Sequence, residues 1–104
     1  MNDKDFEITK QETGNGVKFV LKGRLNSASA NELQYVLDKA LREEQINIVL
    51  NMLKVEYLSS AGIRVILKAY KDSKGAGGTF GIEMPSENVR NVLGMAALGE
   101  MLIR

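Results

Sequence analysis

The alternation of two hydrophobic periods constrains the fold of this chain most. Three segments, starting near residues 27, 60 and 86, carry apolar residues at helical spacing, and short apolar runs lie between them. Because each helix and each strand has an apolar face to bury, strands and helices that alternate in this way form a largely parallel sheet covered by helices. The order therefore predicts an α/β fold with a mixed, mainly parallel sheet and right-handed crossovers.

The sheet is expected to begin with an N-terminal hairpin. The turn cluster Gly14-Asn15-Gly16 separates a loosely alternating run, residues 6–13, from residues 17–22, which are rich in strong β formers. Further strands are predicted at residues 46–50 and 79–84.

Three helices are expected to pack on this sheet. Ser27 or Ser29 is the expected cap of the first, the second runs from about Ser60 to Lys74, and Pro85 with Ser86 opens the third. The expected inward faces are Leu33, Val36, Leu37, Ala40 and Leu41 in the first helix, Ile63, Ile66, Leu67 and Tyr70 in the second, and Val89, Val92, Leu93 and Ala96 in the third. The tail, residues 101–104, is a candidate last edge strand.

The glycine-rich segment Gly75-Ala76-Gly77-Gly78 favours a helix stop over a phosphate cradle. A phosphate-binding loop follows a strand and opens a helix, whereas this segment follows a helix and precedes a strand. Glycine takes the left-handed conformation that helix ends require, so a turn is the better interpretation.

Composition excludes most catalytic chemistry. The 104 residues suit one domain, residues 1–104, and contain no histidine and no cysteine, which removes Ser-His-Asp triads, Cys-His pairs, disulfides and the common zinc sites. The carboxylates are spread along expected outer faces, where solvated surface charge is the simpler interpretation. We therefore expect no enzyme, no metal and no cofactor.

Charge and hydropathy predict a cytoplasmic protein. Fourteen basic and thirteen acidic side chains give a net charge of +1, which offers no long-range attraction to nucleic acid or anionic lipid. The apolar runs are shorter than the roughly 20 residues that span a bilayer. The start of the chain, residues 1–5, lacks the segments of a signal peptide. No membrane insertion and no nucleic-acid partner are expected.

The pair Ser59-Ser60 stands at the expected start of the second helix. Unpaired backbone N–H groups and the positive end of the helix dipole meet there, so a serine can cap the helix or carry a phosphate in a favourable field. Local physics favours Ser59 as the cap and leaves the second role open.

Five segments carry a resemblance to a known family. Residues 58–67, Leu-Ser-Ser-Ala-Gly-Ile-Arg-Val-Ile-Leu, closely resemble the central signature of the STAS domain, which occurs in bacterial anti-sigma factor antagonists. Gly23-Arg24-Leu25-Asn26 is similar to the family's turn after the second strand. Residues 51–57, 77–80 and 89–98 resemble its phosphorylation-loop approach, a later strand entry and its late helix. The resemblance implies a single STAS domain.

The family resemblance implies partner switching. In that scheme an anti-sigma factor with serine kinase activity binds the unmodified antagonist, phosphorylates it and is released, and a phosphatase restores the binding form. By position the acceptor is Ser60, two residues before Gly62, with Ser59 as second choice. The implied partner-binding residues are Asn26, Leu58, Ser59, Ala61, Gly62 and Arg64.

Two residues differ from the family pattern, and an alternative function stays open. Ser59 and Asn26 stand where the family often has aspartate, so the partner meets a less acidic surface, and Arg64 is either a solvated helix residue or a partner contact. The alternative function, also implied by the resemblance, is an accessory subunit that docks on the ATPase of a membrane transport complex without phosphorylation. An enzyme is the third class, and it would need a carboxylate pair in a pocket, for which the sequence has no pattern.

Overall fold

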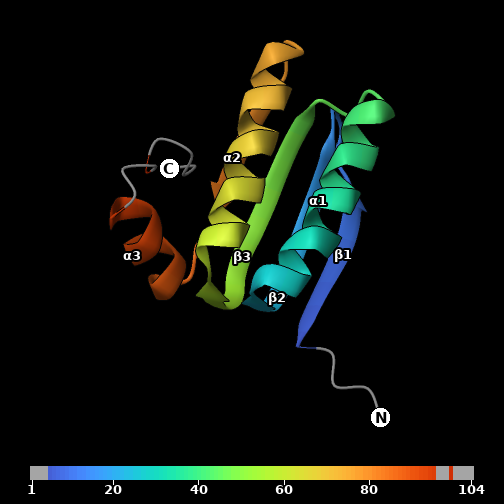
Figure 1. Ribbon diagram of the computed structural model, residues 1–104. Helices are drawn as coiled ribbons and strands as arrows, with labels where there is room; N and C mark the ends of the chain where they lie inside the picture. Colours follow the sequence, from blue (N-terminus) through green and yellow to red (C-terminus); the bar gives the residue numbers. More distant parts are fainter. Residues whose placement is uncertain (1–4, 96–98, 100–104) are drawn as a thin grey trace.

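The computed structural model describes residues 5–95 and Gly99, and it alternates strands and helices as expected (Figure 1). In chain order the elements are β1 (Phe6–Glu12), β2 (Val17–Leu25), α1 (Ser27–Arg42), β3 (Asn47–Leu58), α2 (Ser60–Gly75), β4 (Thr79–Glu83) and α3 (Glu87–Met95). Helices α1 and α2 lie side by side on one face of the sheet, and α3 lies beside its β4 edge, where it packs against β3.

The sheet has the order β1-β2-β3-β4. The β1–β2 pair is an antiparallel hairpin, whereas β2–β3 and β3–β4 are parallel, which confirms the predicted mixed sheet. The hairpin turn closes where the glycines indicate, with the Thr13 amide donating to the Gly16 carbonyl at 3.0 Å.

The core lies between the sheet and the helices. Phe19 and Leu21 of β2 are buried beneath α1, whose Leu33 and Leu37 are also buried and whose Val36 is half-buried. The helical stripe read from the sequence therefore forms the inner face of α1.

Strand β3 is longer than the sequence predicted. The expected strand ended at Leu50, but the observed one continues to Leu58. Its buried positions change from a spacing of two to a spacing of three at Met52, Val55 and Leu58. Irregular pairing with β2 after Val20 accompanies this change, and a strand with irregular pairing does not show simple alternation.

The buried face of α2 differs from the predicted one. Ile66 is fully buried as expected, but Val65, Ala69 and Ser73 are the other buried side chains of the helix, while Ile63, Leu67 and Tyr70 are half-buried. The Ser73 hydroxyl lies within 2.6 Å of the Ile46 carbonyl and 2.9 Å of the Thr79 carbonyl, at the ends of the two strands beside the helix. A buried serine that is fully hydrogen-bonded can occupy the inner face, and apolar periodicity does not reveal it.

The segment from Gly75 to Gly78 ends α2, as predicted. Helix α2 includes Gly75, and Gly77 adopts a positive φ of 89°. The Gly78 amide then donates to the Ser73 carbonyl at 2.8 Å, which closes the helix end. Two predictions, the edge strand at 101–104 and the inward Ala96, lie outside the described residues.

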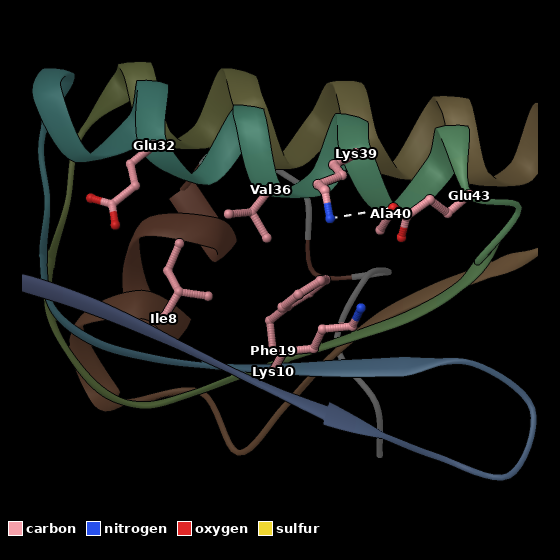
Figure 2. Close-up of a pocket in the computed structure, with 8 residues that line it drawn as sticks. All are labelled: Ile8, Lys10, Phe19, Glu32, Val36, Lys39, Ala40 and Glu43. Atoms are coloured by element: carbon pink, nitrogen blue, oxygen red, sulfur yellow. Dashed lines mark ion pairs between the residues drawn. The ribbon is translucent and has the colours of Figure 1, made fainter.

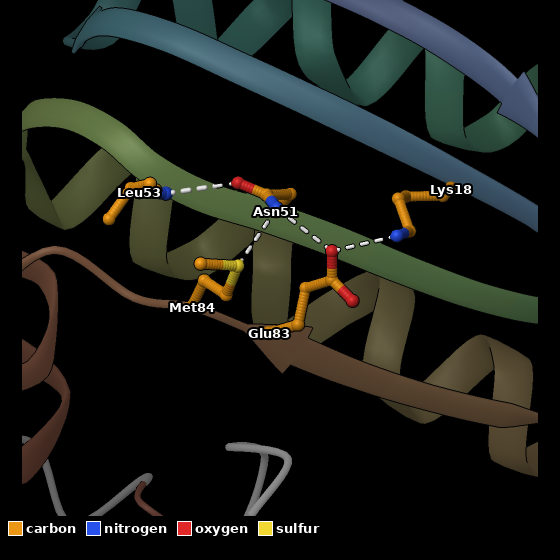
Figure 3. A network of polar contacts seen from close by, with 5 residues as sticks. All are labelled: Lys18, Asn51, Leu53, Glu83 and Met84. Carbon is orange, nitrogen blue, oxygen red and sulfur yellow. Dashed lines mark hydrogen bonds and ion pairs between the residues drawn. The ribbon is translucent and has the colours of Figure 1, made fainter.

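A polar network crosses three strands on the sheet face away from α1 and α2 (Figure 3). Glu83 Oε2 on β4 accepts from Asn51 Nδ2 on β3 at 2.8 Å and lies 2.9 Å from Lys18 Nζ on β2. The pKa of Glu83 is held below its usual value, mainly by the hydrogen bond from the Lys18 ammonium and next by the one from the Asn51 amide. The network explains why a polar residue is tolerated at the centre of β3.

No helix among residues 5–95 is both long enough and apolar enough to cross a bilayer.

Candidate functional site

The candidate site is the corner of the molecule where β2 and β3 end and α1 and α2 begin. The two strands are parallel neighbours, and Leu25 pairs with Leu58 at their last positions. The residues that follow, Asn26 and Ser59, are the N-caps of α1 and α2. Two helix N-termini therefore lie next to each other at the end of the sheet where β2 and β3 stop.

Asn26, not Ser27 or Ser29, caps α1. Its side-chain Oδ1 accepts from the Ser29 amide at 3.0 Å, and the Ser29 hydroxyl accepts from the Asn26 amide at 2.9 Å, so the two residues form a reciprocal capping box. The Ser29 hydroxyl also donates to the Arg24 carbonyl at 2.7 Å. The prediction of a serine cap was wrong because asparagine caps as well as serine does, and Ser29 serves instead as the acceptor that a capping box needs three residues after the cap.

Ser59 is the N-cap of α2, as predicted. Its Oγ accepts from the Gly62 amide at 3.2 Å and donates to the Leu25 carbonyl at 2.8 Å. The Ser59 amide donates to the same carbonyl at 3.0 Å. The half-buried hydroxyl therefore joins the start of α2 to the end of β2.

Ser60 has a different environment from its neighbour. It is the first residue of α2 and is exposed, and its hydroxyl has no hydrogen-bond partner within residues 5–95 and Gly99. The first turn of α2 also contains no acidic side chain. Ser60 thus presents a solvent-accessible hydroxyl at the positive end of a helix.

Gly62 is required because α2 approaches the strand ends closely. A β-carbon at Gly62 would lie 2.8 Å from Leu25 Cγ and 2.9 Å from Leu58 Cδ1, and both leucines are buried. The missing side chain therefore sets how near the start of α2 lies to the sheet.

The structure brings the predicted site residues to this one corner, but not all of them reach its surface. Leu58 and Gly62 are buried and support the site from within. Ala61 is half-buried, as are the two caps, and Arg64 is exposed one turn after Ser60. The surface that a partner can touch is therefore centred on Ser60 and Arg64.

One contact near the ends of β2 and β3, between Arg24 and Tyr57, was not predicted from the sequence. The Arg24 guanidinium lies over the Tyr57 ring, 4.6 Å from its centroid, so a cation–π pair bridges β2 and β3 just before they end. The two residues are 33 positions apart and pair in the parallel register. Only knowledge of that register could have predicted the contact.

An apolar hollow lies elsewhere, between β1, β2 and α1 (Figure 2). It has a volume of about 280 Å³, and apolar side chains line it from both sides, Val36 from α1 and Phe19 from β2. Charged side chains from β1 and α1 surround it, namely Lys10, Glu32, Lys39 and Glu43, with Lys39 and Glu43 paired at 3.3 Å. It shares no residue with the predicted site.

Among the described residues, no cluster of three or more acidic side chains has a geometry that suits a metal ion.

Comparison with known proteins gives a family match over most of the chain. A family model described as the STAS domain matches residues 7–103. BtrV of Bordetella bronchiseptica, named as a candidate anti-sigma factor antagonist, is 32% identical over 72 residues, which span 69% of this chain and 62% of BtrV.

Solved structures resemble the whole described fold. The anti-sigma factor antagonist SpoIIAA in its unphosphorylated form has a TM-score of 0.84 at 18% identity, covering 93% of this chain and 86% of SpoIIAA. Phosphorylated SpoIIAA of Bacillus has a TM-score of 0.78 at 18% identity, over 93% and 89% of the two chains. TM1081 of Thermotoga maritima is 26% identical with a TM-score of 0.78, over 89% of this chain and 75% of TM1081.

Proposed function

The chain belongs to the STAS domain family, and from this premise we propose that it is an anti-sigma factor antagonist controlled by phosphorylation of Ser60. In the proposed cycle the unmodified protein binds an anti-sigma factor with serine kinase activity in the cytoplasm. Phosphorylation of Ser60 releases that partner, and a phosphatase restores the binding form. The protein acts by binding and not by catalysis.

The difference between the two serine hydroxyls carries this proposal. Ser59 Oγ accepts from the Gly62 amide and donates to the Leu25 carbonyl, so a phosphate on it would remove the bond to Leu25 and place negative charge beside that carbonyl oxygen. The Ser60 hydroxyl is exposed and has no partner within the described residues. A kinase can therefore modify Ser60 without disturbing the hydrogen bonds of the folded corner.

The physical effect of the modification is expected to be local. A phosphate adds a charge of about −1.5 to −2 at the helix N-terminus, where the dipole favours an anion by roughly 0.3–1 kcal/mol. The fold should therefore persist, while the surface around Ser60 gains a strong negative charge. Such a change disrupts a docked partner by charge and bulk.

The relatives support the same scheme. The anti-sigma factor antagonist SpoIIAA has been solved in an unphosphorylated and a phosphorylated form. The name of BtrV assigns it to the same functional class.

Phosphate mapping tests the proposed acceptor. The protein is incubated with ATP and kinases of the anti-sigma class, and mass spectrometry locates phosphate in the wild type and in the Ser59→Ala and Ser60→Ala variants. We expect phosphate on Ser60 and none in Ser60→Ala. Phosphorylation of Ser60→Ala at the wild-type rate would show that the acceptor is another residue.

Affinity capture tests the partner. The wild-type protein and a form with phosphoserine at position 60 are used as baits, and bound proteins are identified. We expect a serine-kinase ATPase with the unmodified bait and its loss with the phosphorylated one. Capture of a transporter ATPase by both baits would instead support the accessory-subunit alternative and refute the proposal.

A further inference from the structure

Arg64 lies one helical turn after Ser60 on the exposed side of α2. Residues four apart on a helix are neighbours, with β-carbons about 5–6 Å apart. Helical side chains also lean toward the N-terminus, so a residue covers the surface over the turn that precedes it. A long side chain at position 64 therefore reaches the surface around Ser60.

The Arg64 guanidinium is not engaged by any other group that the structure describes. Within the described residues it has no ion pair, hydrogen bond or ring contact. The next cation on that side of α2, Lys68, is already held by Asp72 at 2.8 Å and Asp38 at 3.4 Å. Of these two cations, only Arg64 can pair with a new anion without losing an existing partner.

We propose that Arg64 receives the phosphate of Ser60, so that after modification its guanidinium folds back over the first turn of α2 and donates hydrogen bonds to the phosphate oxygens. A planar guanidinium suits this role because it can donate two parallel hydrogen bonds to a phosphate. The inference rests on the proposed function, in which Ser60 is the acceptor.

The pairing changes a surface beyond the serine itself. Arg64 lines a hollow of about 210 Å³ between α1 and α2, together with Lys68 and the amide side chains of Asn31 and Gln34. No carboxylate is among its described lining residues. In the unmodified protein, the free guanidinium there favours an acidic group of the partner. Phosphorylation withdraws that charge from the hollow while adding negative charge beside it.

The test uses the full chain with phosphoserine introduced at position 60 during translation, so it does not depend on a kinase. ³¹P NMR measures the second pKa of the phosphate, which is about 6 for free phosphoserine. A paired guanidinium stabilises the dianion, so Arg64→Gln should raise this pKa. An exposed ion pair of about 0.2–1 kcal/mol corresponds to a rise of roughly 0.2–0.7 pH unit.

Two matched variants separate pairing from general charge. Lys71→Gln removes the same charge from the same helix about 10 Å beyond Arg64, and we expect it to leave the phosphate pKa within about 0.1 pH unit of wild type. Arg64→Lys should keep part of the effect, since lysine supplies the charge without the planar fork. The helix N–H groups at the start of α2 are present in every variant, so their effect on the phosphate cancels.

Equal phosphate pKa values in the wild type and in Arg64→Gln would overturn the inference, as would equal rises in Arg64→Gln and Lys71→Gln. Either result would leave the acceptor assignment intact, because that assignment is tested by phosphate mapping. Conversely, a mapped acceptor other than Ser60 would refute the proposed function even if Arg64 bound the introduced phosphate.

Discussion

Replacement of each serine by alanine should separate their roles by stability alone. Ser59→Ala removes an oxygen that accepts from the Gly62 amide and a hydroxyl that donates to the Leu25 carbonyl. Ser60→Ala removes an exposed hydroxyl that has no partner within the described residues. The two changes delete the same atom at adjacent positions, so each is the control for the other.

The expected magnitudes follow from these contacts. Loss of a serine N-cap costs about 0.5–2 kcal/mol, typically near 1. The Leu25 carbonyl still accepts from the Ser59 amide at 3.0 Å, so loss of the second bond adds at most a fraction of a neutral hydrogen bond. We therefore expect Ser59→Ala to lower the free energy of unfolding by about 1–2 kcal/mol. Ser60→Ala should change it by less than about 0.5 kcal/mol, since alanine is a better helix former than serine.

Urea unfolding followed by circular dichroism measures both values. At constant m-value, the midpoint of Ser59→Ala should fall clearly while that of Ser60→Ala stays near wild type. The thermal midpoint of Ser59→Ala should fall by roughly 5–15 °C. Equal losses in the two variants, or a larger loss in Ser60→Ala, would refute the assignment of the cap to Ser59 and of the free hydroxyl to Ser60.

Three other changes test the fold around the site. Gly62→Ala should destabilise the protein by about 1 kcal/mol, because overpacking against two buried leucines outweighs the gain in helix propensity; a calorimetric rise in the thermal midpoint would contradict this. Asn26→Ala should cost about 1–2 kcal/mol in urea unfolding, whereas Asn26→Ser, which keeps a capping oxygen, should retain most of the stability. Since Lys18 lowers the pKa of Glu83, their pairing stabilises the fold above the usual glutamate pKa near 4.3, and this contribution is lost as the pH falls through the lowered pKa. Lys18→Met should therefore be less stable than wild type at pH 7, and this deficit should shrink as the pH falls below the usual glutamate pKa; a deficit that stays constant as the pH falls would show that the pairing is not the cause.

The elements with a clean period or a glycine turn could be predicted from the sequence. The hairpin at Gly14-Asn15-Gly16, the buried face of α1 and the stop after α2 follow from local patterns, and the structure confirms them. The second half of β3 could not be predicted in this way, because its buried positions follow the irregular pairing with β2 and not a period of two. The predicted inner face of α2 differs from the observed one because a buried serine, Ser73, stands in the buried stripe where an apolar residue was expected.

At the candidate site, local rules predicted the Ser59 cap and the family resemblance gave Ser60 as the acceptor. The contacts that distinguish the two serines could not be predicted, because one of them reaches the carbonyl of Leu25, which is far away in sequence. The same holds for the Arg24–Tyr57 pair. Such contacts depend on strand order and register. The hydrophobic pattern of one sequence does not specify either.

The bond from Ser59 to the Leu25 carbonyl has a consequence for how a modifying enzyme can recognise this protein. The bond joins residues 34 positions apart and exists only where β2 and β3 are paired. A synthetic peptide copied from residues 58–67 contains both serines but lacks that carbonyl, so the Ser59 hydroxyl has no native acceptor there. Under the proposed function, the substrate of the kinase is therefore a conformational epitope of the folded domain and not a linear motif.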